Sequence, residues 1–418
     1  MLGGILFAGS VIRLLLLPTE GLRGDLDQFV GWVHHIATAG LRTLYSGTDA
    51  GPVTFGPVMA YVWTVLSAIQ PAFATVTDAS DPAIRALMKV PASLADVGLA
   101  ALVAWALRAR PGWAVVAAAG VFLHPAVFYV SSWWGQYESI FALTGLAAVI
   151  AAVNGRNGPA AALVAVSLMT KPQAIPFLVP FAAWFWSSGY GRSGGYGGVG
   201  GGLREVARCA LIGLGVIVAL WLPLLPDGPG GYLANLGTYQ NEIFNVLSLR
   251  AWNPWWLLQE TTAGGDFIRD DIAFAGPLTL RHVGYLVTAV LTLVIAWAIV
   301  RDPRPRTFVL GLVASVLVVF TFMTQMHERY AYAALILLVL LIPESRERWF
   351  WVVFGIVFTL NLVAAVPATP DLAATLPVSG PLGILGSVAM TALTVLAIRC
   401  RANHATIGTR SSVTLPSE

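Results

Sequence analysis

Apolar runs of about twenty residues recur along the whole chain, separated by short polar segments. A hydrocarbon core about 30 Å thick is crossed by roughly 20 apolar helical residues, so such runs predict membrane-spanning helices. The pattern predicts helices at residues 1–18, 86–107, 113–131, 138–153, 158–170, 172–188, 206–224, 277–300, 307–323, 329–343, 349–366 and 381–399. The predicted fold class is all-α: a polytopic bundle of about twelve transmembrane helices, forming one integral membrane domain over residues 1–400.

The composition supports a membrane protein, since 57% of the 418 residues are hydrophobic and only 11% are charged. A water-soluble globular protein could not bury so many apolar side chains. We therefore expect the lipid bilayer as a partner and no nucleic acid. Cys209 and Cys400 fall at helix ends that we place in the cytoplasm, so no disulfide is predicted. The first segment lacks a basic start and a cleavage site, and Arg13 interrupts it, so we expect it to be retained.

The segment at residues 52–72 is also long enough to span, but the charge distribution argues against it. If it lies along the outer leaflet as an interfacial helix, the arginines of the short loops, such as Arg108, Arg301 and Arg399, all face the cytoplasm. Both termini are then cytoplasmic. The outer side carries loop 19–85 and the long loop 226–277, where the aromatic stretch W-N-P-W-W-L-L-Q-E predicts a second juxtamembrane helix.

Two low-complexity segments are predicted to lie on the cytoplasmic side. The Gly-rich run 187–204 is expected to be a flexible linker and not a phosphate loop, because no strand precedes it. Residues 401–418 are expected to form a disordered tail.

Acidic residues at the outer surface provide the first candidates for chemistry. Asp25 and Asp27 follow the first apolar segment within R-G-D-L-D-Q-F-V-G-W, residues 23–32. Side chains at i and i+2 point apart on a helix, so one carboxylate is expected to act on a substrate while the other braces the loop or meets water. The plain alternative is a pair of solvated surface acids.

Cationic residues at helix ends provide the second set. Lys171, one of only two lysines, begins K-P-Q-A at the outer mouth of a helix, where an unpartnered charge is costly. His327, Glu328 and Arg329 supply a donor, an acceptor and a fixed cation in M-H-E-R-Y, and an Arg fork matches phosphate oxygens. The alternatives are a snorkelling lysine and a cluster that only anchors a helix.

Two further outer stretches carry polar and aromatic candidates, at residues 133–139 (W-W-G-Q-Y-E-S) and 245–256 (N-V-L-S-L-R-A-W-N-P-W-W). Arg250 lies close to a group of tryptophans that are suited to an acyl chain or a sugar face, although an aromatic belt explains them equally well. Arg13 and Asp96, both inside predicted helices, are expected to form a mutual or cavity-facing charge pair that holds those helices together. The outer stretches all end at one face, so they are expected to share one cavity.

In this order the stretches resemble the GT-C superfamily of membrane glycosyltransferases that use polyprenyl-phosphate sugars. The branches they resemble are the bacterial relatives of the second mannosyltransferase of GPI-anchor assembly and the dolichyl-phosphate-glucose glucosyltransferases. The stretch G-D-L-D-Q-F-V-G-W is similar to the family's Asp-bearing loop, and M-H-E-R-Y to its His-Glu-basic motif. F-G-P-V-M-A-Y is similar to a Tyr-Pro-Pro element, with Phe55-Gly56 in place of Tyr-Pro.

The resemblance implies an inverting transferase that moves a sugar, with mannose as the first candidate, from a polyprenyl-phosphate donor to a glycan, lipid or protein acceptor. It implies Asp25 as general base, with Asp27 beside it, and an active site on the outer face of a bacterial cytoplasmic membrane. Donor phosphate contacts are expected from Lys171, His327, Arg329 and Arg250. The expected substrate pocket comprises Trp32, Gln136, Glu138, Gln173, Trp252, Asn253 and Glu328.

No metal cluster or cofactor is predicted, and a divalent ion between Asp25 and Asp27 stays open as an alternative. The competing function is a transporter or flippase of a lipid-linked sugar. Such a protein is expected to carry charges near the bilayer midplane and two similar halves, whereas the candidate charges here gather at one face.

Overall fold

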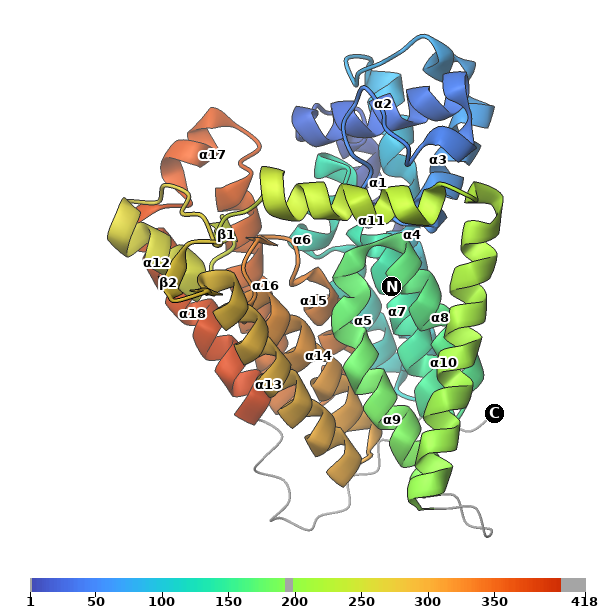
Figure 1. Ribbon diagram of the computed structural model, residues 1–418, viewed down its shortest axis with the longest axis vertical. Coiled ribbons are helices and arrows are strands. Elements are labelled where there is room, and N and C mark those ends of the chain that lie inside the picture. The colour runs from blue at the N-terminus through green and yellow to red at the C-terminus, as the bar shows by residue number, and fades with distance from the viewer. Residues whose placement is uncertain (1, 192–197, 400–418) are drawn as a thin grey trace.

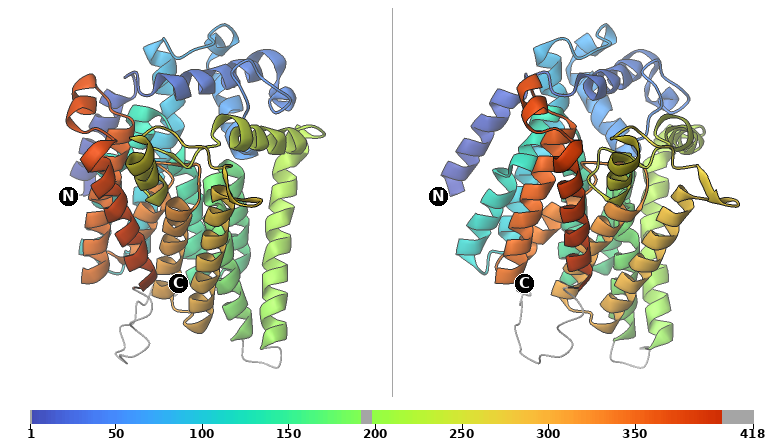
Figure 2. Two further views of the ribbon diagram at one scale, coloured as in Figure 1. Left: turned by 60° about the vertical axis from the view of Figure 1, so that its left-hand side comes forward. Right: turned by 90° about the vertical axis from the view of Figure 1, so that its left-hand side faces the viewer.

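The computed structural model describes residues 2–191 and 198–399, which form a tall helical bundle with a cap of shorter helices over one end (Figures 1 and 2). The predicted tail at 401–418, the centre of the predicted Gly-rich linker and Cys400 lie outside the described residues.

Each of the twelve predicted membrane segments falls on a helix of the bundle. These helices are α1 (Leu2–Leu16), α4 (Pro82–Ala106), α5 (Pro111–Phe122), α7 (Glu138–Val153), α8 (Asn157–Thr170), α9 (Leu178–Tyr190), α10 (Val199–Trp221), α13 (Leu280–Arg301), α14 (Pro305–Phe322), α15 (Tyr332–Leu338), α16 (Ser345–Ala365) and α18 (Gly380–Arg399). Within the described ranges only α4, α10, α13, α14, α16 and α18 are long and apolar enough to cross a bilayer unaided. The all-α membrane class is confirmed, whereas twelve full spans are not.

Several helices break at the capped end of the bundle, and prolines account for two of the breaks. α5 is followed by α6 (Pro125–Phe128) and the π-helix η3 (Tyr129–Trp134), with a bend of 41°. α8 gives way to the 3-10 helix η4 (Pro172–Phe177), while η5 (Leu222–Leu224) continues α10 and η7 (Val339–Leu341) continues α15. A residue before proline is pushed out of the helical region, and Lys171 is accordingly extended (φ −154°, ψ 137°).

The cap is built from three loop regions far apart in sequence. Its elements are α2 (Arg23–Ala39), η1 (Leu41–Thr43), α3 (Pro57–Ile69), η2 (Pro71–Ala74), α11 (Gly228–Thr238), η6 (Tyr239–Ile243), α12 (Pro254–Ala263) and α17 (Pro370–Thr375). At 13 residues α3 is about 20 Å long, too short for a bilayer core of about 30 Å. This length fits the expectation that residues 52–72 do not span. α11 runs across the end of the bundle (Figure 1).

Two very short sheets complete the cap. β1 (Ser248–Leu249) pairs in parallel with β4 (Met326–His327), so that Leu249 lies opposite His327. β2 (Ala273–Ala275) and β3 (Leu278–Thr279) form an antiparallel hairpin. The first pairing fixes the long loop after α10 beside the segment between α14 and α15, an arrangement that the hydrophobic pattern did not predict.

The cap has its own apolar core, which sets the orientation of α2. Phe29 and Trp32 on α2 are buried against Phe55, Trp63 and Tyr137, with ring centroids 5.2 to 6.3 Å apart. Aromatic packing of this kind stabilises beyond simple area burial, by about 0.5–1.5 kcal/mol per pair. The face of α2 that carries these rings is therefore held toward the bundle.

Candidate functional site

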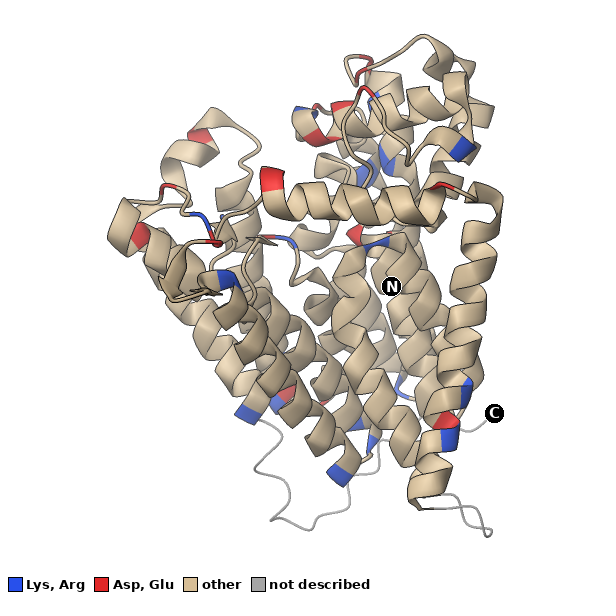
Figure 3. Ribbon diagram, viewed as in Figure 1, with Lys and Arg blue, Asp and Glu red and all other residues tan. Residues whose placement is uncertain are grey.

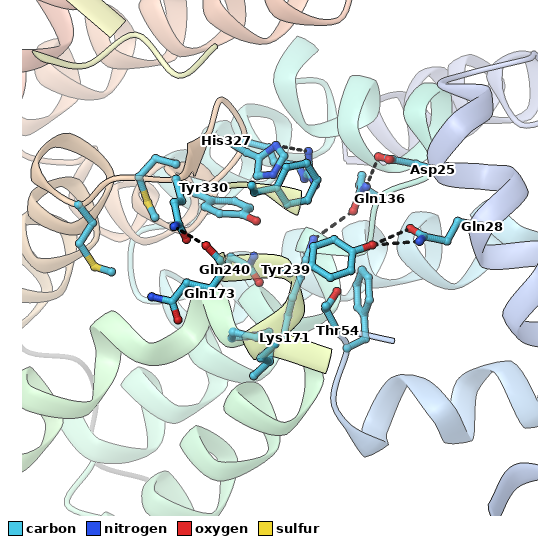
Figure 4. Close-up of a pocket in the computed structure, with 18 of the residues that line it drawn as sticks. Asp25, Gln28, Thr54, Gln136, Lys171, Gln173, Tyr239, Gln240, His327 and Tyr330 are labelled. Carbon is cyan, nitrogen blue, oxygen red and sulfur yellow. Dashed lines mark hydrogen bonds between the residues drawn. The ribbon is translucent and has the colours of Figure 1, made fainter. Parts of the chain in front are cut away.

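One cavity of about 420 Å³ lies where the cap meets the bundle (Figure 4). It is lined by Asp25, Gln28, Phe29, Trp32, Thr54, Phe55, Gln136, Lys171, Pro172, Gln173, Leu236, Tyr239, Gln240, Phe244, Tyr285, Met323, Thr324, Gln325, Met326, His327, Arg329 and Tyr330. The lining comes from residues 25 to 330, so the fold gathers segments from most of the chain around one space.

Asp25 reaches the cavity from the first turn of α2. It lies on the same helical face as Phe29 and Trp32, at i, i+4 and i+7, so the buried aromatics aim its carboxylate. Its Oδ2 atom accepts hydrogen bonds from Trp134 Nε1 at 2.9 Å and from Gln136 Nε2. Oδ1 accepts none of the hydrogen bonds found among the described residues. One carboxylate oxygen is thus fixed and the other is open.

Gln136 joins the carboxylate to the neighbouring cation. Its Nε2 donates to Asp25, while its Oε1 accepts from Lys171 Nζ at 3.1 Å, which Figure 4 shows as a continuous chain. The tight turn before it depends on Gly135, whose φ of +94° is costly for any residue with a Cβ. An added Cβ there would also lie 2.6 Å from the Leu26 side chain.

Two cations share one buried carboxylate at the wall of the cavity. Glu138, which is fully buried, forms ion pairs with Lys171 Nζ and with Arg329 Nε, the latter at 3.2 Å. Arg329 Nη1 also contacts Glu328 Oε1 at 3.1 Å. Burial lowers the pKa of Lys171 from 10.5 to about 8, and Glu138 counteracts this shift. Lys171 therefore stays charged at neutral pH and titrates slightly above it.

His327, which we expected to contact the donor phosphate, lies in the cavity wall. Burial, and then the nearby charges of Arg329 and Lys171, lower its pKa well below the usual value. At neutral pH the imidazole is uncharged, and one of its nitrogens lies 3.4 Å from Arg329 Nη1. A neutral imidazole can still donate or accept a hydrogen bond, and the expected contact of His327 with a donor phosphate stays a prediction.

The position where Phe55-Gly56 departs from the family pattern has a steric explanation here. Gly56 N donates to Thr170 O at 3.2 Å, and an added Cβ would lie 2.1 Å from Met169 O. Only glycine allows this close approach of the cap to the end of α8. The approach places the Phe55 ring 4.9 Å from Lys171 Nζ, close enough for a cation–π contact.

Asp27 does not line the cavity. Its Oδ1 accepts from Ala79 N at 2.8 Å and from Arg23 Nε at 3.1 Å, so it ties α2 to the loop before α4. Of the two carboxylates, Asp25 lines the cavity and Asp27 braces the loop, while the expected action of Asp25 on a substrate stays a prediction. The physical reason is the i, i+2 spacing on a helix, which directs the two carboxylates apart.

Arg250, Trp252 and Asn253 do not line the cavity either, although the Arg250 backbone forms a bridge with His327. Arg250 Nη1 donates to Ala365 O at 3.0 Å, and Trp252 Nε1 donates to Val378 O at 3.1 Å. Asn253 caps α12 by accepting from Trp256 N at 2.9 Å. These contacts hold the loop after β1 against the end of α16, the loop between α17 and α18, and the start of α12. Glu138 and Glu328 lie behind the cavity wall, where they pair with its cations.

Several lining residues were not among the sequence candidates. Gln28 Nε2 donates to Tyr239 Oη at 3.0 Å and so joins α2 to η6 at the cavity. Gln240 O accepts from Gln325 Nε2 at 2.9 Å on the opposite side. Reading residues 23–32 as a helix instead of a loop would have identified Gln28, because it lies three residues after Asp25 and four before Trp32.

No protein-family model matches the chain, and no curated protein matches it in sequence. Among solved structures it is similar to the oligosaccharyltransferase of Archaeoglobus fulgidus in three forms. The form tethered to an acceptor peptide aligns at 13% identity and TM-score 0.41, over 98% of this chain and 56% of that one. The apo form aligns at 12% identity and TM-score 0.41, over 96% of this chain and 56% of that one. The complex with an inhibitory peptide and a dolichol-phosphate aligns at 13% identity and TM-score 0.43, over 96% of this chain and 56% of that one.

The chain spans a little over half the length of that archaeal enzyme. With TM-scores below 0.5, the alignments do not establish a common fold.

Proposed function

We propose that the chain is an inverting membrane glycosyltransferase of the GT-C type. It moves a sugar, with mannose as the first to test, from a polyprenyl-phosphate donor to an acceptor glycan, lipid or protein. The observation that carries the proposal is the Asp25–Gln136–Lys171 chain, which places a half-free carboxylate and a buried cation on one cavity wall. General base and leaving-group cation are the two groups that such a transfer requires.

The proposed step is a single displacement at the anomeric carbon of the donor sugar. The acceptor hydroxyl oxygen forms the new bond to this carbon as its proton passes to Asp25 Oδ1. The bond from the carbon to the phosphate oxygen breaks, and the polyprenyl phosphate leaves with the electron pair. Attack from the opposite side inverts the configuration.

Lys171 and Arg329 are the groups proposed to stabilise the departing phosphate. Arg329 Nη2 makes none of the hydrogen bonds found among the described residues, so one arm of the guanidinium fork is available for an anion. A dianionic leaving group is already stable, so the step needs no strong general acid. Because these two cations compensate its charge, we also propose that the reaction requires no divalent metal.

The proposed orientation directs the cavity toward the outer face of a bacterial cytoplasmic membrane. Figure 3 shows basic residues at the end of the bundle opposite the cap, as at Arg301 and Arg399, which end α13 and α18. Loops rich in arginine favour the cytoplasmic side, which would leave the cap outside. The residues between Arg301 and Pro305 form one such loop.

The test is a transfer assay with radiolabelled polyprenyl-phosphate mannose and envelope acceptors in membranes that contain the full chain. Asp25→Asn is expected to reduce the transfer rate by about 10²–10⁴-fold, because the base is lost. Asp27→Asn is the matched control and is expected to retain most activity, since that carboxylate lies outside the cavity. If Asp25→Asn left transfer intact but abolished movement of a lipid-linked sugar across the bilayer, the transporter function would replace the transferase.

A further inference from the structure

The hairpin formed by β2 and β3 exposes an unbroken apolar stretch. All seven residues from 272 to 278, I-A-F-A-G-P-L, are exposed. Ile272, Phe274 and Leu278 have 50%, 56% and 40% of their surface accessible. Exposed apolar residues on soluble surfaces are usually scattered singly, whereas a contiguous group indicates a surface that another apolar phase covers.

The hairpin has regular strand pairing and a defined turn. Ala275 pairs with Leu278 across a two-residue turn of Gly276 and Pro277, in which Gly276 has φ +58°. A positive φ followed by the fixed φ of proline suits the tight turns that join antiparallel strands.

The base of the hairpin is anchored to the bundle and to the cavity wall. Asp270, fully buried, pairs with Arg281 Nη2 at 2.8 Å and accepts from Thr324 Oγ1 at 2.7 Å and Gln325 Nε2 at 2.9 Å. Thr324 and Gln325 line the cavity, so the hairpin and the site share one anchor.

The hairpin lies at the level where a membrane helix begins. β3 ends at Thr279, and α13, one of the long apolar helices, starts at Leu280. α13 exposes Leu286, Leu293 and Trp297 by 60% or more, which is expected of a helix that faces lipid. The right-hand view of Figure 2 shows the hairpin projecting sideways from the bundle near the start of this helix.

We propose that the tip of the β2–β3 hairpin inserts into the bilayer leaflet next to the cavity, with Ile272, Phe274 and Leu278 in contact with acyl chains. The partner is lipid rather than protein, because the exposed surface continues into the lipid-facing side of α13 and carries no charge between residues 272 and 278. The proposal does not depend on the transferase function.

The depth of insertion follows from the backbone. A two-stranded hairpin has two free edges whose N–H and C=O groups need water or headgroups, so it cannot enter the centre of the hydrocarbon. The exposed Arg269–Asp271 ion pair, at 2.6 Å, lies just before the apolar stretch and is suited to the headgroup region. The side chains therefore reach only the boundary between headgroups and acyl chains.

The test places an environment-sensitive fluorophore on Phe274→Cys in the full chain, with Cys209 and Cys400 replaced by Ser, in phosphatidylcholine proteoliposomes. Quenching by lipids that carry a nitroxide on the upper acyl chain is compared with quenching by aqueous iodide. Ala374→Cys on exposed helix α17 is the matched control. We expect lipid quenching to exceed iodide quenching at least several-fold at Phe274, and the reverse at Ala374.

Ile272→Cys provides a second labelled site on the same surface, in case the Phe274 variant does not fold. Strong iodide quenching with no lipid quenching at both hairpin sites would show a water-exposed hairpin and overturn the proposal. Protection from both quenchers would show that protein covers the tip, which would also overturn it.

Discussion

Two groups of buried charges in this molecule have similar composition and opposite character. In the first, deep in the bundle, Arg13 pairs with Asp96 at 2.8 Å and also donates to Gly9 O and Phe122 O. Asp96 accepts in addition from Ser131 and Ser139. In the second, at the cavity, Lys171 and Arg329 share Glu138, and the carboxylate of Asp25 is only half used. The first group is closed, while the second opens onto a space.

The two groups show how a charge that stabilises the fold can be separated from a charge proposed to act on a substrate. Glu138 and Ser139 are adjacent at the start of α7, yet one serves the cavity and the other the closed group. Burial alone does not distinguish them, since both lie at zero exposure. The distinguishing feature is an unused donor or acceptor directed at a cavity, as at Asp25 Oδ1.

The largest expected effect comes from breaking the closed group. Arg13→Met leaves Asp96 as an unpaired buried charge and is expected to cost about 3–5 kcal/mol in the free energy of unfolding. The double change Arg13→Met with Asp96→Leu should recover much of this loss. Thermal unfolding in detergent micelles measures both. A fall in donor affinity without any loss of stability would mean that this pair belongs to the active site.

The next effect distinguishes the two lysines of the chain. Lys171→Met is expected to weaken donor binding by about 10–100-fold, the equivalent of a charge-assisted hydrogen bond worth about 1.5–3 kcal/mol. Lys89→Met is the matched control, because Lys89 is fully buried but donates to Thr19 O at 2.8 Å near the end of α1. That variant should lose stability and keep donor affinity per folded molecule. Equilibrium binding of labelled polyprenyl phosphate tests the pair, and equal losses would remove Lys171 from the phosphate site.

The pH dependence of binding gives a smaller, graded effect. Because the pKa of Lys171 is lowered to about 8, donor affinity is expected to fall as pH rises through that value and the ammonium loses its charge. Stability is expected to move the other way, since between about pH 8 and 10.5 the unfolded chain binds the proton that the folded chain releases. Donor titrations and unfolding at pH 7, 8 and 9 check both directions. Lys171→Arg should abolish the fall in affinity, and an unchanged profile would contradict the assignment.

The smallest expected effect is that of metal removal. Lys171 and Arg329 are proposed to compensate the phosphate charge, so transfer after treatment with EDTA should equal transfer before it. A loss that Mg²⁺ or Mn²⁺ restores would show that the cations of the cavity wall are insufficient.

The sequence predicted the helices well because apolar periodicity reports burial and lipid contact directly. It did not predict their breaks at η3 and η4, where proline and local packing override the apolar pattern. It also placed a helix start at residue 277, whereas the Gly276–Pro277 turn makes residues 273–279 a hairpin. An apolar hairpin directly before an apolar helix gives one continuous apolar run, so the sequence alone does not show where the helix begins.

For the site, the sequence identified Asp25, Gln136, Lys171 and Arg329 as candidates, and the structure places all four at one cavity. It could not show that Lys171 and Arg329 share Glu138, because that pairing joins residues far apart in the chain. Nor could it show that burial lowers the pKa of His327. These properties arise from tertiary contacts, and local residue patterns do not report them.

The most direct measurement is a structure of the full chain in lipid nanodiscs with a non-transferable polyprenyl-phosphate sugar bound. We predict that the phosphate lies between Lys171 Nζ and Arg329 Nη2, with the anomeric carbon facing the open Oδ1 atom of Asp25 across a gap that admits an acceptor hydroxyl. A phosphate bound elsewhere, with Lys171 and Arg329 engaged only by Glu138 and Glu328, would contradict it.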